Sequence, residues 1–223
     1  MKRLLITIDG PGGAGKTTVS RKVARRLGYT YVDTGALYRA VALAVSRCDG
    51  SGHDEEALEQ VCRNLKLEFK DTLRGSVLLM DGVDVSEAIR TQDITMAASR
   101  LSAERVVRQH LLGIQRRMGE AGGVVFEGRD MGTVIFPWAD KKFFLFADVQ
   151  VRAERRYREL LAKGYAVELE AVLESIKKRD HDDSSRALAP LKPARDAIRI
   201  DSSDLDVEEV VDRVLSYVDH PPK

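Results

Sequence analysis

The sequence contains few of the residues that build metal centres and disulfide frameworks. Its 223 residues include two cysteines, Cys48 and Cys62, and four histidines. The cysteines lack the short spacing of zinc ligands and have no histidine nearby, so we expect reduced thiols in the core. Four scattered histidines do not assemble a Ser-His-Asp or Cys-His set, which argues against hydrolase chemistry of that type.

The sequence also lacks an excess of either charge and any long apolar run. Because 36 Lys and Arg face 35 Asp and Glu, no overall field favours a nucleic-acid polymer. The apolar run at 4–8 ends at Asp9, too soon for a signal peptide or a membrane span. We therefore expect a cytoplasmic protein with neither nucleic-acid polymers nor membranes as partners.

Short apolar segments alternate with helical patterns along most of the chain. This alternation predicts an α/β fold with a parallel sheet and crossover helices. The strands are expected at 4–8, 29–32, 124–126, 142–147 and 197–200, and the helices at 16–27, 35–45, 150–163, 169–179 and 207–218. Residues 64–102 break the rhythm with short strands at 65–69 and 76–82, so we expect a small inserted subdomain there.

The strongest motif is a glycine-rich loop at 10–17 with the pattern G-x-x-x-x-G-K-[ST]. It follows an expected strand and precedes an expected helix, which is the context that a P-loop requires. Its backbone N–H groups can converge on phosphate oxygens at the helix N-terminus, where the helix dipole also favours anions. Lys16 is expected to reach the β and γ phosphates and Thr17 to lie beside Mg²⁺.

Two further motifs follow expected strands and so lie at the same edge of the sheet. In the first, at 33–39, Arg39 is a candidate for binding a second phosphate; the plainer alternative is that Asp33 caps a helix and Arg39 is solvated. In the second, at 127–130, Arg129 can grip a phosphate and Asp130 can accept from an amino group. The alternative there is a turn with a cap.

Arginines gather between 152 and 158 and again in the segment 179–186, on either side of a loop around Gly164. Arginines on a closing lid can stabilise the charge of a transferred phosphoryl group. Alternatively, those beside Glu154 and Glu159 form a salt-bridged surface. A metal site around His181 is not favoured, because adjacent polar residues in a loop do not converge.

Taken together, residues 8–16, 33–39, 89–91, 128–134 and 189–191 closely resemble bacterial cytidylate kinases, of the P-loop nucleoside monophosphate kinase superfamily. The segments DTGALYR and GRDMGT, in this order, are the specific ones. The resemblance implies a P-loop kinase fold with a five-stranded parallel sheet flanked by helices. Within a single kinase domain, 1–223, it implies a core at about 1–60 and 103–223, a monophosphate-binding insertion at about 61–102 and a short lid at about 152–166.

The resemblance also implies the activity, which is transfer of the γ-phosphoryl group of ATP to CMP or dCMP in pyrimidine metabolism. ATP with Mg²⁺ is then a co-substrate, no tightly bound cofactor is expected, and the protein is expected to be a monomer. The sequence departs from the commonest family pattern at Thr17, where glycine is frequent, and at Glu127, where aspartate is usual. The second departure leaves open how a carboxylate there orients Arg129 or a metal-bound water.

By motif position, the resemblance assigns roles to individual residues. Lys16, Arg129, Arg155 and Arg156 would be catalytic. Arg39, Arg129 and Arg186 would hold the acceptor phosphate, Arg179 and Asp183 the sugar, and Ser99, Arg108 and Asp130 the base, with Thr34 lining the same pocket. ATP would be bound by Gly10, Pro11, Gly12, Gly13, Ala14, Gly15, Lys16, Thr17 and Thr18, with Thr17 also placed at the Mg²⁺ ion.

The chemistry of the base supports this choice of acceptor. Cytosine offers an amino donor and two acceptors, which match a carboxylate and an arginine. Uracil would oppose Asp130 with an acceptor, at a cost of roughly 1–3 kcal/mol per unpaired group, so we expect weak use of UMP. The alternatives are a P-loop kinase for UMP, AMP or shikimate, and a nucleotide-dependent switch, although the chain lacks the Asn-Lys-x-Asp guanine signature.

Overall fold

The computed structural model describes residues 3–48, 54–72 and 75–219. The chain forms two compact units. The first unit comprises Met1–Tyr31 with Gly122–Lys223, and the second is Val32–Ala121. The insertion predicted at 61–102 falls within the second unit, and its role in binding a monophosphate stays a prediction.

The main sheet confirms the predicted five strands. Its order is β2-β6-β1-β7-β8, with β1 parallel to both β6 and β7, and β7 parallel to β8. The central strand β1 is fully buried, as its uninterrupted apolar run indicated. The strands are β1 (Leu5–Asp9), β2 (Thr30–Asp33), β6 (Val124–Gly128), β7 (Lys141–Phe146) and β8 (Ile198–Asp201).

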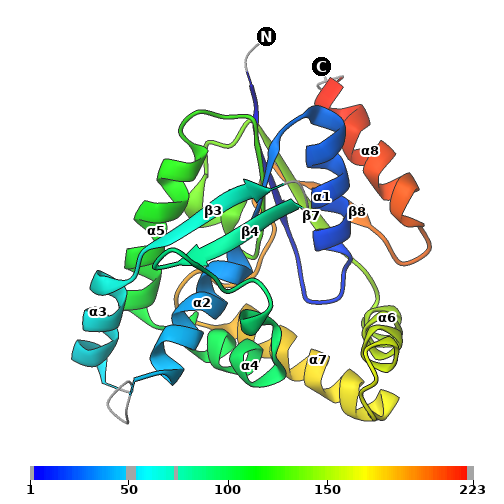
Figure 1. Cartoon of the computed structure of the whole chain (residues 1–223). Coiled ribbons are helices and arrows are strands. Elements are labelled where there is room, and N and C mark those ends of the chain that lie inside the picture. Colours follow the sequence, from blue (N-terminus) through cyan, green and yellow to red (C-terminus); the bar gives the residue numbers. More distant parts are fainter. Residues whose placement is uncertain (1–2, 49–53, 73–74, 220–223) are drawn as a thin grey trace. The chain divides into compact units, whose positions relative to one another are not determined.

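Helices α1 (Lys16–Leu27) and α8 (Val207–Asp219) pack side by side in the first unit (Figure 1). Their apolar faces share one core cluster with the sheet, which includes Ile6 and Ile8 of β1, Val23 of α1 and Val211 of α8. Gly28 ends α1 in the left-handed conformation, at φ 64°, as the sequence predicted. This packing fixes the start of α1 against the end of β1.

Helices α6 (Val149–Ala162) and α7 (Leu169–Ser185) pack against each other in the same unit. The sequence predicts that α7 ends at Arg179 and that a loop follows it. This prediction is wrong, because α7 extends to Ser185. The helix continues for six residues beyond Arg179, because Asp180 and Asp183 are paired with arginines and Ser184 donates to the carbonyl of Asp180 at 2.7 Å. A polar segment that looked like a loop is therefore helical.

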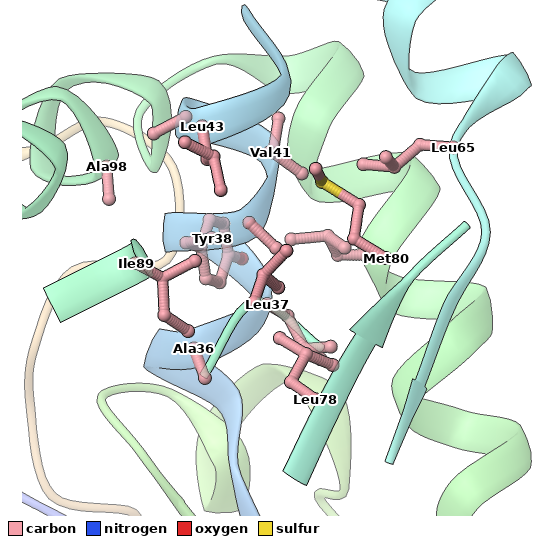
Figure 2. Packing of buried hydrophobic residues seen from close by; sticks show 14 of the residues in the cluster. Ala36, Leu37, Tyr38, Val41, Leu43, Leu65, Leu78, Met80, Ile89 and Ala98 are labelled. Atoms are coloured by element: carbon pink, nitrogen blue, oxygen red, sulfur yellow. The ribbon is translucent and has the colours of Figure 1, made fainter. Parts of the chain in front are cut away.

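The second unit has its own core, which Figure 2 shows between helix α2 (Thr34–Ser46) and strand β4. Leu37, Leu78 and Ile89 are among its most buried side chains. The two predicted strands are present in an antiparallel sheet of β3 (Leu67–Thr72), β4 (Gly75–Met80) and β5 (Val83–Asp84). The remaining elements, none of them predicted, are α3 (Glu55–Asn64), the short helix η1 (Ala88–Arg90), α4 (Gln92–Leu101) and α5 (Arg105–Gly119).

Both cysteines are free thiols. Cys62 is buried in the second unit, but Cys48 is exposed just beyond the end of α2, so the prediction of a core position holds for one and is wrong for the other. Across residues 3–48, 54–72 and 75–219, no group of three His, Cys, Asp or Glu side chains is placed to bind a metal ion. In those same ranges no helix has both the length and the apolar character of a membrane span.

Candidate nucleotide and phosphoryl-transfer site

The predicted P-loop forms where β1 ends and α1 begins. Gly10, at φ 149°, requires glycine, because a Cβ atom there would lie 1.9 Å from the carbonyl oxygen of Leu145. Gly15, at φ 85°, is the residue that caps α1 at its N-terminus, and no side chain caps the helix there. The first-turn N–H groups of α1 are therefore available to an anion.

Lys16 is the buried cation of this loop. The residue is 4% exposed, and its Nζ atom donates to the carbonyl of Pro11 at 2.7 Å. Burial, with repulsion from the guanidinium of Arg129, lowers the pKa of Lys16 to about 7. A polyphosphate would offset both effects, since it brings several negative charges to the same place.

Thr17 and Glu127, the two departures from the family pattern, contact each other. The Thr17 hydroxyl donates to Oε1 of Glu127 at 2.9 Å, and the Tyr31 hydroxyl donates to Oε2 at 2.6 Å. Glu127 belongs to β6, which pairs directly with β1, so the strand register places it beside the start of α1. Hydroxyl and carboxylate oxygens are hard donors of the kind that Mg²⁺ prefers, so these side chains fit that ion.

Asp9 ties the P-loop strand to the segment after β6. Its two carboxylate oxygens accept from the backbone N–H groups of Met131 and Gly132 at 2.9 and 2.8 Å. These residues begin η2 (Met131–Ile135), a π-helical turn that follows Asp130. Burial raises the pKa of Asp9 to about 6, although the two N–H donors oppose that rise. Asp9 therefore fixes the GRDMGT segment next to the P-loop.

One polar cluster of the first unit contains Arg129, Asp130, Asp183 and Arg186. Nε of Arg129 donates to Oδ2 of Asp183 at 2.9 Å, and both side chains are less than 20% exposed. The guanidinium of Arg186 lies 3.8 Å from Asp130 and 3.9 Å from Asp183. Burial disfavours both charges of the Arg129–Asp183 pair, but their attraction prevails, which raises the pKa of Arg129 and lowers that of Asp183. Two sequence motifs, at 127–130 and 179–186, thus supply one cluster of charges.

This cluster faces the P-loop. A Cβ atom on Gly12 would lie 3.7 Å from Nη2 of Arg129 and 4.0 Å from Cδ of Arg179. Arg179 sits one helical turn before Asp183 on α7, so it lies on the same helix face. The structure therefore places Arg129 and Arg179 beside the loop that carries Lys16, and the predicted role of Arg179 at the sugar stays a prediction.

Arg152 also contacts the P-loop, although it was not among the predicted site residues. It donates from Nε to the carbonyl of Ala147 at 2.9 Å and from Nη1 to the carbonyl of Gly12 at 3.1 Å. Nη2 pairs with Asp180 at 2.7 Å. The sequence placed Arg152 only within a run of helical arginines, and the spacing of that run does not distinguish a buried member from an exposed one.

The two predicted catalytic arginines of α6 bind protein groups. Arg155 donates to the carbonyl of Ser202 at 2.6 Å, and the hydroxyl of Ser202 in turn donates to the carbonyl of Ala14 in the P-loop at 3.2 Å. Arg156 pairs with Glu159 at 2.8 Å, and both side chains are at least 40% exposed. Arg156 thus has the salt-bridged surface arrangement that was the alternative for this helix. The catalytic role of both arginines stays a prediction.

The other predicted acceptor residues belong to the second unit. Asp33 caps α2 by accepting from the N–H of Ala36 at 3.1 Å, and it also pairs with Arg39 at 2.8 Å. The cap was the plainer alternative for Asp33, and it is confirmed, but Arg39 is only 18% exposed rather than solvated. Thr34 is buried in the first turn of the same helix.

The base-reading candidates of the second unit lie on α4 and α5. The guanidinium of Arg108 lies 5.9 Å from the ring centroid of Tyr38 and donates to the carbonyl of Ser102 at 3.1 Å. The Ser102 hydroxyl in turn donates to the carbonyl of Ser99 at 2.7 Å. Ser99 and Arg108 are therefore linked through one turn, and their role in reading the base stays a prediction.

Comparison with known proteins identifies the family of this chain. The family model for cytidylate kinase matches residues 6–220. The chain is 48% identical to a cytidylate kinase of Syntrophotalea carbinolica and 47% identical to one of Geobacter sulfurreducens, over 97% and 96% of its length and 92% of each relative. Among solved structures, the shikimate kinase of Bacteroides thetaiotaomicron shares the P-loop kinase fold, with a TM-score of 0.50 at 15% identity over 96% of this chain and 98% of the other. Because the family model and both relatives match nearly the full length of the chain, this protein belongs to the cytidylate kinase family.

Proposed function

We propose that this chain transfers the γ-phosphoryl group of ATP to CMP or dCMP, which yields ADP and CDP or dCDP. Membership of the cytidylate kinase family supports the reaction. The observation that carries it within the fold is the meeting of the P-loop with the Arg129, Asp130, Asp183 and Arg186 cluster. The P-loop would bind a polyphosphate, and the arginines of the cluster would present cations to a second phosphate.

The reaction needs positioning and charge neutralisation more than it needs a protein nucleophile. The attacking CMP phosphate is already an anion near neutral pH, so no general base is required. Lys16 would neutralise charge on the β and γ phosphates, and Arg129 would hold the acceptor phosphate in line with them. Lid arginines, Arg155 and Arg156, would act after exchanging their present partners for phosphate oxygens.

Asp130 and Asp183 would orient the acceptor rather than react with it. Asp130 is 2% exposed and lies beside Arg186, so a carboxylate held there can accept from the N4 amino group of cytosine. Asp183 and Arg179 share a face of α7 and would hold the sugar. The roles of Thr34, Arg39, Ser99 and Arg108 in binding the acceptor stay predictions.

Mg²⁺ would be held at Thr17 together with ATP, where it would neutralise phosphate charge. Glu127 fixes the Thr17 hydroxyl by accepting its hydrogen bond, which leaves the lone pairs of the hydroxyl oxygen to face the ion. We expect Thr17→Val to raise the Mg²⁺ concentration required for half-maximal turnover by about tenfold, the loss of one charge-assisted contact. An unchanged Mg²⁺ requirement in that variant would place the ion elsewhere.

The test of the function is ADP formation from MgATP with CMP, dCMP, UMP, AMP, shikimate or no acceptor, run in parallel. Strong stimulation by CMP and dCMP, and weak stimulation by UMP, is expected. Stimulation by a different acceptor would refute the assignment of the base-reading residues but leave the P-loop in place. Turnover without any acceptor would point to the nucleotide-dependent switch instead.

The remaining expectations concern the protein as a whole. We propose that it acts in the cytoplasm as a monomer, in pyrimidine metabolism, and without a tightly bound cofactor. Family membership supports the small nucleotide substrates, and the near balance of charge supports the absence of a polymer partner. Sedimentation of the purified protein with and without CMP would test the monomer directly.

A further inference from the structure

Arg152 is the charged side chain that joins the P-loop to two helices. It lies in the first turn of α6 and its side chain is 7% exposed. Each of its three guanidinium nitrogens is engaged with a different partner: the carbonyl of Ala147, the carbonyl of Gly12 and the carboxylate of Asp180. Because all three nitrogens already have protein partners, the Arg152 side chain has little freedom to turn toward a ligand.

The P-loop also rests on the backbone of Arg152. A Cβ atom on Gly13, which has φ 77°, would lie 3.1 Å from Cβ and 3.2 Å from the carbonyl oxygen of Arg152. The Gly12 carbonyl therefore points to the guanidinium, while the glycine next to it packs on the same residue. Since a peptide unit is planar, fixing the Gly12 carbonyl also fixes the N–H of Gly13 on its opposite side.

Asp180 completes the arrangement from α7. Its Oδ2 atom pairs with Arg152, whereas its Oδ1 atom is buried and accepts no hydrogen bond within the described part of the chain. Arg152 is thus the partner that neutralises this carboxylate by direct contact. Asp180 lies between Arg179 and Asp183, both of which belong to the proposed acceptor site. Arg152 thus connects the P-loop, through its hydrogen bond to Gly12, with the helix that carries these residues, through its ion pair with Asp180.

We infer that Arg152 is a positioning residue, which acts with Asp180 to hold the Gly12–Gly13 peptide of the P-loop in the orientation that binds the ATP phosphates. This inference rests on the proposed function, because it assumes that the P-loop binds ATP. Arg152 would contribute to the reaction through the loop, not by touching phosphate. Its partner Asp180 would contribute equally, although a carboxylate repels phosphate.

The test compares Arg152→Met, Arg152→Lys and Asp180→Asn with the parent protein, by calorimetric titration with ATP in the absence of acceptor. Lys177→Met is the matched control, since Lys177 forms an exposed ion pair with Glu174 on the same helix as Asp180. We expect Arg152→Met and Asp180→Asn to raise the Kd for ATP by about tenfold to a hundredfold, as for the loss of a hydrogen bond to a charged group. Arg152→Lys keeps the charge but loses the fork, so it is expected to fall between the parent and Arg152→Met.

Steady-state kinetics give a second readout. The variants are expected to raise the KM for ATP while the KM for CMP and kcat at saturating ATP stay within about twofold, because ground-state and transition-state binding are weakened alike. If Asp180→Asn binds ATP as the parent does while both Arg152 variants bind it weakly, Arg152 touches phosphate directly and the inference fails. A lower Tm with an unchanged Kd in all three variants would show a purely structural role and would also overturn it.

The design separates this inference from the proposed function. If Arg152→Met does not fold, Arg152→Lys and Asp180→Asn decide the outcome. If the parent protein binds ATP but ignores CMP, the proposed function fails, and the ATP titrations still decide the role of Arg152.

Discussion

Two groups of cations in the first unit have different surroundings. Lys16, Arg129 and Arg152 are buried or nearly so. Lys16 donates to the carbonyl of Pro11 in its own loop, whereas Arg129 and Arg152 pair with aspartates from a distant helix. Arg156 and Arg158, on the outer face of α6, pair with glutamates three or four residues away and are at least 40% exposed. An arginine-rich helix therefore does not by itself define a site, because its members differ in what they contact.

The difference has an energetic basis. An exposed pair within a helix contributes a few tenths of a kcal/mol, since water screens the charges and the side chains lose entropy. Removal of one partner from a buried pair costs about 3–5 kcal/mol, since the other charge stays uncompensated. Substitutions in the two groups should therefore have effects of different size and on different properties.

The largest effect is expected at Lys16. Lys16→Ala removes the cation placed at the ATP phosphates, so turnover should fall by about a thousandfold, in the range found for a lost transition-state donor. The Tm should stay the same or rise, because burial already disfavours this charge in the folded protein. The measurements are kcat in the ADP assay and thermal unfolding of the same preparation. A Lys16→Ala protein with a near-normal rate would contradict the mechanism.

Arg129→Met should have the next largest effect. It removes the guanidinium that lies between Gly12 and Asp183, and it leaves Asp183 without its closest cation. We expect kcat/KM for CMP to fall by about a hundredfold, together with a lower free energy of unfolding. The double variant with Asp183→Asn should recover stability but not activity. Recovery of both would assign Arg129 to folding alone.

A buried acid in the same region offers a pH test. The pKa of Asp9 in the folded protein, about 6, lies above its ordinary value of 3.8, so ionisation of Asp9 favours the unfolded chain. Its contribution is complete below pH 3.8 and is lost as the pH rises through 6, by on the order of 3 kcal/mol. Urea unfolding of the parent and of Asp9→Asn between pH 4.5 and 7.5 measures this difference. A pH-independent difference would show that Asp9 keeps an ordinary pKa.

The smallest effects are expected on the exposed face of α6. Arg158→Met should change kcat by less than about twofold, as for a surface pair. Arg156→Met should lower kcat by about tenfold without changing the Tm, if Arg156 exchanges Glu159 for a phosphoryl oxygen during turnover. Equal rates in the two variants would leave both arginines to the surface and remove Arg156 from the mechanism.

Much of the fold was predictable, because its strands are short apolar runs bounded by turn residues. The five parallel strands and the helices after the P-loop came from periodicity alone. In the second unit, α2 was predicted, but α3, η1, α4 and α5 were not. Helix α5, for example, carries His110 and Gln115 among its apolar positions, and Gln115 is nevertheless fully buried. A pattern that requires apolar residues on the buried face does not detect such a helix.

The site was predictable where one local motif determines the geometry, and less so where distant residues meet. The P-loop needs only eight consecutive residues, since glycine conformation and the helix N-terminus create its binding groups. The contact between Thr17 and Glu127 joins residues 110 positions apart, and it turns two separate departures from the family pattern into one hydrogen bond. No local pattern contains that information.

The sequence by itself determined the P-loop, the parallel sheet and the charged motifs at the ends of its strands, because apolar periodicity and loop conformation follow from local residue types. The tertiary structure decided which arginines are buried and which are solvated, that the segment after Arg179 is helical, and that Arg152 supports the P-loop. The physical reason is that the cost and the benefit of a charge depend on its surroundings, and elements far apart in the chain create those surroundings.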